Sequence, residues 1–119
     1  VGVALQKTDA SIGGNGVLHF CASTGRDYLV PFLLECYADP HATNAERATP
    51  LHLAVLAGAP GVLPPLLDAR AHIDARNRRG ETPLMLAAHR LDQEIVTMLL
   101  ERRADPNEAT KEAHFTALH

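Results

Sequence analysis

The sequence predicts an all-α solenoid, in which antiparallel helix pairs are stacked side by side and joined by hairpin-like loops. Three observations support this fold class. The chain of 119 residues repeats with a period of 33 residues, and only 4% of its residues are aromatic, with no tryptophan. Apolar residues recur in each period at the spacing of a helical stripe. A core of Leu, Val, Ile and Ala suits thin stacked layers, which bury their stripes against one another.

The period is visible as columns of matching residues that lie 33 positions apart. Each unit has a pair of leucines, followed by an acid and then, three residues after the acid, by an alanine. The columns are Leu18, Leu51 and Leu84; Leu33, Leu66 and Leu99; Leu34, Leu67 and Leu100; Glu35, Asp68 and Glu101; and Ala38, Ala71 and Ala104.

The first helix of a unit is predicted to begin at a Thr-Pro pair, which is Thr49 and Pro50 in the second unit and Thr82 and Pro83 in the third. Thr can cap the exposed N–H groups, and Pro at the first helical position lacks an N–H that would have no partner. Gly58 is expected to end the helix of the second unit. Small and aliphatic residues are expected to let these helices pack closely: Leu51, Ala54, Val55 and Ala57, then Leu84, Ala87 and Ala88.

A second helix is predicted in each unit from apolar residues at offsets 0, +1, +4 and +5, which form one stripe. Pro60, Pro64 and Pro65 lie in or near this helix in the second unit, and Pro31 lies in that of the first. Proline inside a helix costs about 3 kcal/mol, so these helices are expected to start late, to be kinked or to be short. The stripes are Leu29, Val30, Leu33 and Leu34; Val62, Leu63, Leu66 and Leu67; and Ile95, Val96, Leu99 and Leu100.

Longer connections, interpreted as loops or hairpins, separate the units, and residues 77–80 give the clearest turn signal. The chain ends at the opening of a helix and its first unit has no polar cap, so we expect a piece of a longer protein or ends that a partner covers. The predicted divisions are 1–13, a flank or the remnant of an earlier unit; 14–47, a divergent first unit; 48–80, the second; 81–114, the third; and 115–119, the start of a truncated fourth.

These units resemble ankyrin repeats over residues 14–119. The first unit departs from the family pattern at Gly16 and Val17, where the family prefers Thr-Pro, and the third has Leu91 where the family usually has Gly. The resemblance is carried by Thr49-Pro50-Leu51-His52-Leu53-Ala54, Gly58, Leu66-Leu67, Ala71 and Asp74; by Thr82-Pro83-Leu84-Met85-Leu86-Ala87-Ala88, Leu99-Leu100-Glu101 and Ala104-Asp105-Pro106-Asn107; and, more weakly, by Gly16-Val17-Leu18-His19-Phe20-Cys21-Ala22 and Thr116-Ala117-Leu118-His119.

The resemblance implies a non-catalytic scaffold that binds a protein partner through its concave face and loop tips. Arginine is enriched at binding hot spots and pairs with carboxylates through two hydrogen bonds, so the arginine-rich loop of residues 76–79 is a candidate site. Leu56 is a second candidate, because it is an apolar residue in a column expected to face the groove. The full set of partner-binding candidates is Glu46, Leu56, Arg76, Arg78, Arg79, Glu81, His89, Arg90 and Lys111.

The sequence favours neither catalysis nor a metal or cofactor site. His19, His52 and His119 lack metal-ligand spacing, and the resemblance gives this column the role of tying neighbouring loops by hydrogen bonds. Cys21 falls in an inward column and does not face His19 across a helix, which favours core packing over a nucleophile. The glycines of residues 13–16 lack the Lys and the strand-helix context of a phosphate loop.

The composition favours a protein as the partner, because it points to neither nucleic acid nor a membrane. The net charge is −3, which does not favour nucleic acid, and no apolar run reaches the length of a membrane span. The two cysteines lack a disulfide framework and are interpreted as reduced thiols, so an intracellular location, cytoplasmic or nuclear, is expected. Two further functions remain open: an architectural segment of a large multi-protein assembly, and a regulatory repeat segment of a larger enzyme or channel.

Overall fold

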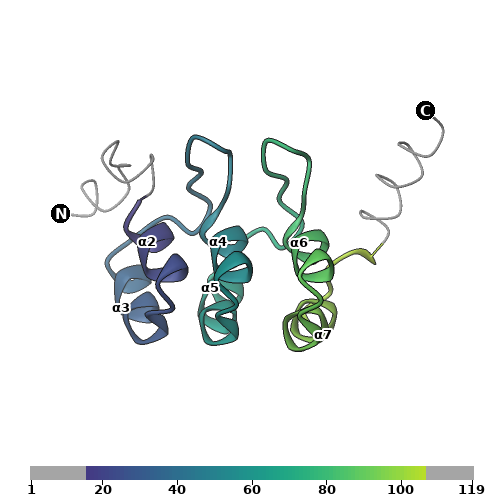
Figure 1. Cartoon of the computed structure of the whole chain (residues 1–119). Coiled ribbons are helices and arrows are strands. Elements are labelled where there is room, and N and C mark those ends of the chain that lie inside the picture. Colours follow the sequence, from purple (N-terminus) through teal and green to yellow (C-terminus); the bar gives the residue numbers. More distant parts are fainter. Residues whose placement is uncertain (1–15, 107–119) are drawn as a thin grey trace.

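The computed structural model describes residues 16–106, and within this range the chain forms helices and connections without strands. Three helix pairs stand side by side as layers, and two long loops project from the same edge of the stack (Figure 1). The pairs are α2 (Val17–Ser23) with α3 (Val30–Glu35), α4 (Pro50–Ala57) with α5 (Leu63–Asp68), and α6 (Pro83–His89) with α7 (Gln93–Glu101). The predicted all-α solenoid is confirmed.

The first helices begin where the Thr-Pro pairs predict. Thr49 Oγ1 accepts a hydrogen bond from the N–H of His52 at 3.3 Å, and Thr82 Oγ1 accepts one from the N–H of Met85 at 3.2 Å. Gly16 offers no side-chain cap to α2, as its departure from Thr-Pro predicts. Gly58 ends α4 with a φ of 66°, in the left-handed region that suits a glycine after a helix.

The prolines lie in the first turns of the second helices, where they break no internal hydrogen bond. A 3-10 turn, η3 (Pro60–Val62), precedes α5, and a similar turn, η2 (Asp27–Leu29), precedes α3. Pro64 and Pro31 then occupy the opening positions of α5 and α3. These two helices have 6 residues each, whereas α7, which contains no proline, has 9. They therefore start late and are short.

The core runs through the stack as a continuous cluster, because α2 packs on α4 and α4 packs on α6. Each layer places a small residue where first helices approach, and Ala22, Ala54 and Ala87 have no exposed surface. The second helices add their stripes from the other side. The residues of this cluster without any exposed surface also include Val30, Leu51, Val55, Val62, Leu63, Leu66, Ile95 and Leu99.

Three residues expected to pack inward are exposed instead. Ala57 lies on the last turn of α4, beyond the buried face. Ala88 occupies the column of Ala22 and Val55, which the following layer buries, but among the described residues no layer follows α6 and α7. Leu100 is 44% exposed at the outer edge of its stripe. A column in the sequence therefore predicts burial only where the neighbouring layer is present.

Candidate protein-binding groove

Two hairpins form the walls of the candidate site, and an asparagine organises each of them. Asn44 Oδ1 accepts hydrogen bonds from the N–H groups of Glu46 (2.9 Å) and Ala48 (3.0 Å) in the first hairpin, residues 39–48. Asn77 Oδ1 accepts bonds from Arg79 (3.0 Å) and Glu81 (2.9 Å) in the second hairpin, residues 72–81. An asparagine carboxamide thus holds each turn closed from inside.

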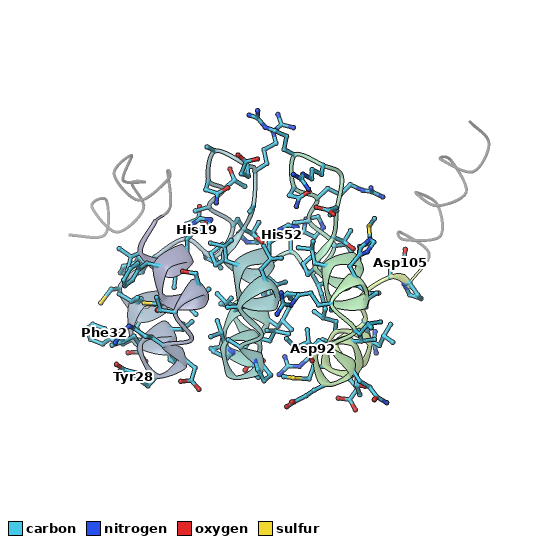
Figure 2. All side chains as sticks on the ribbon, in the orientation of Figure 1. His19, Tyr28, Phe32, His52, Asp92 and Asp105 are labelled. Atoms are coloured by element: carbon cyan, nitrogen blue, oxygen red, sulfur yellow. The ribbon has the colours of Figure 1, made fainter. Side chains whose placement is uncertain are left out.

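Buried histidines fasten each hairpin to the helix of the preceding layer, and Figure 2 shows His19 and His52 at the bases of the hairpins. Nε2 of His19 lies 2.8 Å from the carbonyl oxygen of Ala48, and Nε2 of His52 lies 2.8 Å from that of Glu81. Since a carbonyl can only accept, Nε2 carries the proton in both rings.

In both rings Nδ1 accepts a hydrogen bond, so it carries no proton and both histidines are neutral. Nδ1 of His19 accepts from the N–H of Gly16 at 3.1 Å, and Nδ1 of His52 accepts from the N–H of Thr49 at the same distance. Burial is the main cause that lowers the pKa of both imidazoles, and hydrogen bonds to the carbonyls of Ala48 and Glu81 oppose it. The tie is therefore a neutral imidazole that bridges two backbone segments.

The hairpins are also joined to each other near their tips. The N–H of Arg78 donates to the carbonyl oxygen of Glu46 at 2.8 Å. Together with the histidine ties, this bond fixes the distance between the two walls. The walls and their floor are therefore parts of the folded scaffold.

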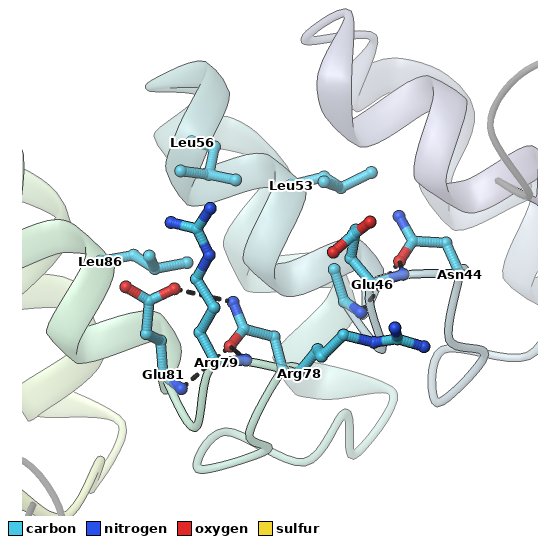
Figure 3. Close-up of a pocket in the computed structure, with 10 residues that line it drawn as sticks. Asn44, Glu46, Leu53, Leu56, Arg78, Arg79, Glu81 and Leu86 are labelled. Carbon is cyan, nitrogen blue, oxygen red and sulfur yellow. Dashed lines mark hydrogen bonds between the residues drawn. The ribbon is translucent and has the colours of Figure 1, made fainter.

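A groove of about 420 Å³ lies between the two hairpins and the helices α4 and α6. Its floor is aliphatic and its walls carry charges (Figure 3). Leu86 is nearly buried and Leu56 is 44% exposed, so the floor offers apolar surface to a partner. The lining consists of Asn44, Glu46, Ala48, Leu53, Leu56, Asn77, Arg78, Arg79, Glu81 and Leu86.

The family model for ankyrin repeats matches residues 18–110, in three copies. The chain belongs to the ankyrin repeat family. A comparison with curated proteins gives no significant match to this chain. Ankyrin repeats are generally protein-protein interaction modules and are typically non-catalytic.

Five of the predicted partner-binding residues line the ankyrin groove: Glu46, Leu56, Arg78, Arg79 and Glu81. The structure places three others elsewhere. Arg76 donates from Nη1 to the carbonyl of Gly80 at 2.8 Å, so it helps to close its own hairpin. His89 ends α6 and Arg90 follows it, and the Arg90 guanidinium lies beside the turn at Gly58. Lys111 lies outside the described residues.

Sequence reasoning missed Leu53 and Leu86 as parts of the groove floor. Both lie in the middle of a first helix, between the Thr-Pro cap and the residues that end the helix, which are the positions that carry the recognisable signals. Their signal was present, because they stand 33 positions apart and so occupy the same place in two neighbouring repeats. Asn44 and Asn77 show the same spacing, which could have identified them as organisers of equivalent turns.

Metal-binding clusters and an activated thiol were the two kinds of chemical site to check among the described residues. Within residues 16–106, no three His, Cys, Asp or Glu side chains gather in a cluster that could hold a metal ion. Burial raises the pKa of the Cys21 thiol, against a smaller opposing effect of Arg26, and so disfavours the thiolate that a nucleophile needs. In the part of the chain that the structure describes, no helix is long and apolar enough to cross a bilayer.

Proposed function

We propose that this ankyrin repeat chain is a non-catalytic scaffold that binds a protein partner in the groove between hairpins 39–48 and 72–81. The observation that carries the proposal is the groove itself, an open space of about 420 Å³ with an aliphatic floor and charged walls. An apolar centre surrounded by polar groups is the usual anatomy of a protein–protein interface. Hydrogen bonds of two buried histidines hold the walls in place, so the binding surface is preorganised before a partner binds.

Site-specific photo-crosslinking in native extract tests this function. A photoreactive phenylalanine analogue replaces Leu56 on the groove floor in one variant and Glu101, which is exposed on α7, in a matched control. Both variants are first shown to be folded by circular dichroism. We expect a protein adduct with the groove variant and none with the control. A partner recovered only from the α7 position would place binding on the outer helices and contradict the proposal.

The architectural alternative has one observation in its favour, which is the accumulation of exposed aromatic residues on the first layer. Phe20, Tyr28, Phe32 and Tyr37 all have large exposed surfaces, and Figure 2 shows Tyr28 and Phe32 at the edge of that layer. Large apolar surface exposed in this way marks contact sites. If the chain is an assembly component, it should elute from a size-exclusion column in a large complex when native extract is applied, and the double variant Phe20→Ser/Phe32→Ser should elute later, as the free chain.

For its location we propose the cytoplasm or the nucleus. Cys21 and Cys36 are both free thiols, which fits a reducing compartment. Imaging of the tagged chain in cells tests this location, and secretion of the chain would contradict it.

A further inference from the structure

We propose that the groove binds an extended protein segment in which an aliphatic side chain and a carboxylate stand two residues apart. This partner chemistry rests on the function proposed above and specifies it. The carboxylate would be bound by Arg79, and the aliphatic side chain would lie on Leu53 and Leu56.

The floor of the groove determines the aliphatic part of the motif. Leu56 is 44% exposed and Leu53 is half-buried beside it, whereas Leu86 is nearly buried and closes the far side. Covering the exposed surface of Leu56 removes apolar area from water, at about 25 cal/mol for each Å². An aliphatic side chain of the partner is therefore the chemistry that fits this floor.

The charges of the second hairpin determine the acidic part. Its two acids are already used inside the protein: Oε1 of Glu81 accepts from Nδ2 of Asn77 at 3.1 Å, and Oδ1 of Asp74 accepts from the N–H of Asp105 at 3.0 Å. The guanidinium groups of Arg78 and Arg79 make no hydrogen bond or ion pair with any described residue, although their backbone N–H groups do.

On the other wall, Glu46 is the charged residue of the first hairpin that lines the groove, and it is exposed near the hairpin tip. The charged residues that line the groove are two cations, Arg78 and Arg79, and two anions, Glu46 and Glu81, so their formal charges balance. The two guanidinium groups are nevertheless donors without a partner among the described residues, and such donors fit a carboxylate of the bound segment. A guanidinium is also the side chain best suited to bind a carboxylate through two parallel hydrogen bonds.

The position of Arg79 determines the spacing of the motif. Figure 3 shows its side chain extending along the groove toward Leu56, whereas Arg78 extends toward the hairpin that carries Asn44 and Glu46. A carboxylate bound by Arg79 and an aliphatic group on Leu56 must therefore enter the same side of the groove. In an extended segment, side chains alternate between two faces, so residues that point the same way are two, four or more positions apart, and two is the shortest of these spacings.

The test begins with a library of random peptides displayed on phage, selected on the whole 119-residue chain. Phage that also bind the folded double variant Leu56→Ser/Arg79→Gln are removed, which leaves peptides that depend on the groove. We expect enrichment of peptides in which an aliphatic residue and Asp or Glu stand two positions apart, in either order. Enrichment of basic residues, enrichment of adjacent aliphatic and acidic residues, or no enrichment at all would overturn the proposal.

The most enriched peptide is then synthesised with a fluorescent label, together with a copy in which its acid is changed to the amide. Fluorescence anisotropy should show binding that is weaker by about tenfold or more when either the peptide acid or Arg79 is neutralised, as expected for a charge-assisted hydrogen bond. Combining the amide peptide with Arg79→Gln should weaken binding no further. Independent, multiplicative losses would show that Arg79 does not contact the carboxylate.

Arg70→Gln is the matched control for the charge change, because Arg70 is exposed, its guanidinium makes no hydrogen bond or ion pair with a described residue, and it lies outside the groove. It should bind the peptide as the parent does, and a loss equal to that of Arg79→Gln would also overturn the proposal. These experiments can reject the proposed partner chemistry without rejecting the proposed scaffold function. An adduct at Leu56 without any acidic peptide preference would retain the scaffold and reject this partner chemistry.

Discussion

At the scale of single residues, one column of the repeat holds two kinds of side chain, and they make different contacts. His19 and His52 bridge backbone segments, and in the third repeat Met85 stands in their column. The sulfur of Met85 lies 3.4 Å from the N–H of Thr82, so it takes the acceptor role of Nδ1 but has no N–H to donate. Of these three residues, only the two histidines can both accept and donate, and so only they tie a hairpin to their helix.

The histidine ties predict that stability falls in mild acid. The pKa of both rings is lowered in the folded chain, below the ordinary value of 6.5. On acidification the unfolded chain therefore binds protons first, which favours unfolding as the pH falls below about 6.5 and continues until the folded pKa is passed. Urea denaturation at a series of pH values between neutral and mildly acidic measures this loss.

The double variant His19→Met/His52→Met is the comparison, because the chain itself uses Met85 at that position. It should be less stable than the parent at neutral pH, and its stability should change less between neutral and mildly acidic pH. A pH dependence equal to that of the parent would assign the effect to other groups.

At the scale of elements, the turns after the helices differ in the strain that they contain. Gly25 and Gly58 end the first helices of two repeats with φ of 70° and 66°, and Leu91 takes the same place in the third with φ of 57°. Tyr37, Arg70 and Arg103, which follow the second helices, also have positive φ. Non-glycine residues are disfavoured there because the side chain crowds the carbonyl oxygen.

Leu91→Gly should therefore stabilise the chain. Leu91 is 88% exposed, so its removal sacrifices little packing. The relief of left-handed strain, about 1–2 kcal/mol, exceeds the added entropy of a glycine in the unfolded chain, about 0.4–1 kcal/mol. We expect a net gain of about 0.5–1 kcal/mol in urea denaturation. Leu91→Ala, which keeps the strain, is the control and should change stability little; an equal gain for both would exclude the backbone as the cause.

At the scale of the whole molecule, the middle layer contacts both of its neighbours, because α4 packs on α2 and on α6. Stability in such stacks comes from the interfaces between layers, since no single helix pair can bury its own stripe. The middle layer therefore takes part in every interface that the described residues contain, and it holds the floor leucines Leu53 and Leu56.

Leu66→Ala should destabilise the entire stack. Leu66 has no exposed surface, so its truncation leaves a cavity and costs about 2–5 kcal/mol. Leu100→Ala is the control, because Leu100 is a leucine of the last described layer that is 44% exposed. Urea melts followed by circular dichroism should show a much larger shift for the first variant. Equal shifts would mean that the core stripe is wrongly assigned.

The period of the sequence predicts many features of this structure, and the other features depend on contacts between repeats. The Thr-Pro caps, the stop at Gly58 and the short proline-bearing helices all depend on local geometry, which a single repeat encodes. Burial of Ala88 depends on a further layer, and the groove floor depends on two hairpins coming together over Leu53 and Leu86. The bond from Arg76 to Gly80 depends on the shape of the folded turn, which residue type alone does not reveal.

The asparagine and histidine bonds that hold the hairpins have a consequence for the thermodynamics of association. Because both walls are ordered by folding itself, the entropy lost on complex formation falls mainly on the partner. Affinity should therefore respond more to stiffening of the partner segment, by cyclisation or by proline outside the contacts, than to stiffening of the scaffold. Dissociation rates, rather than association rates, should carry most of that change.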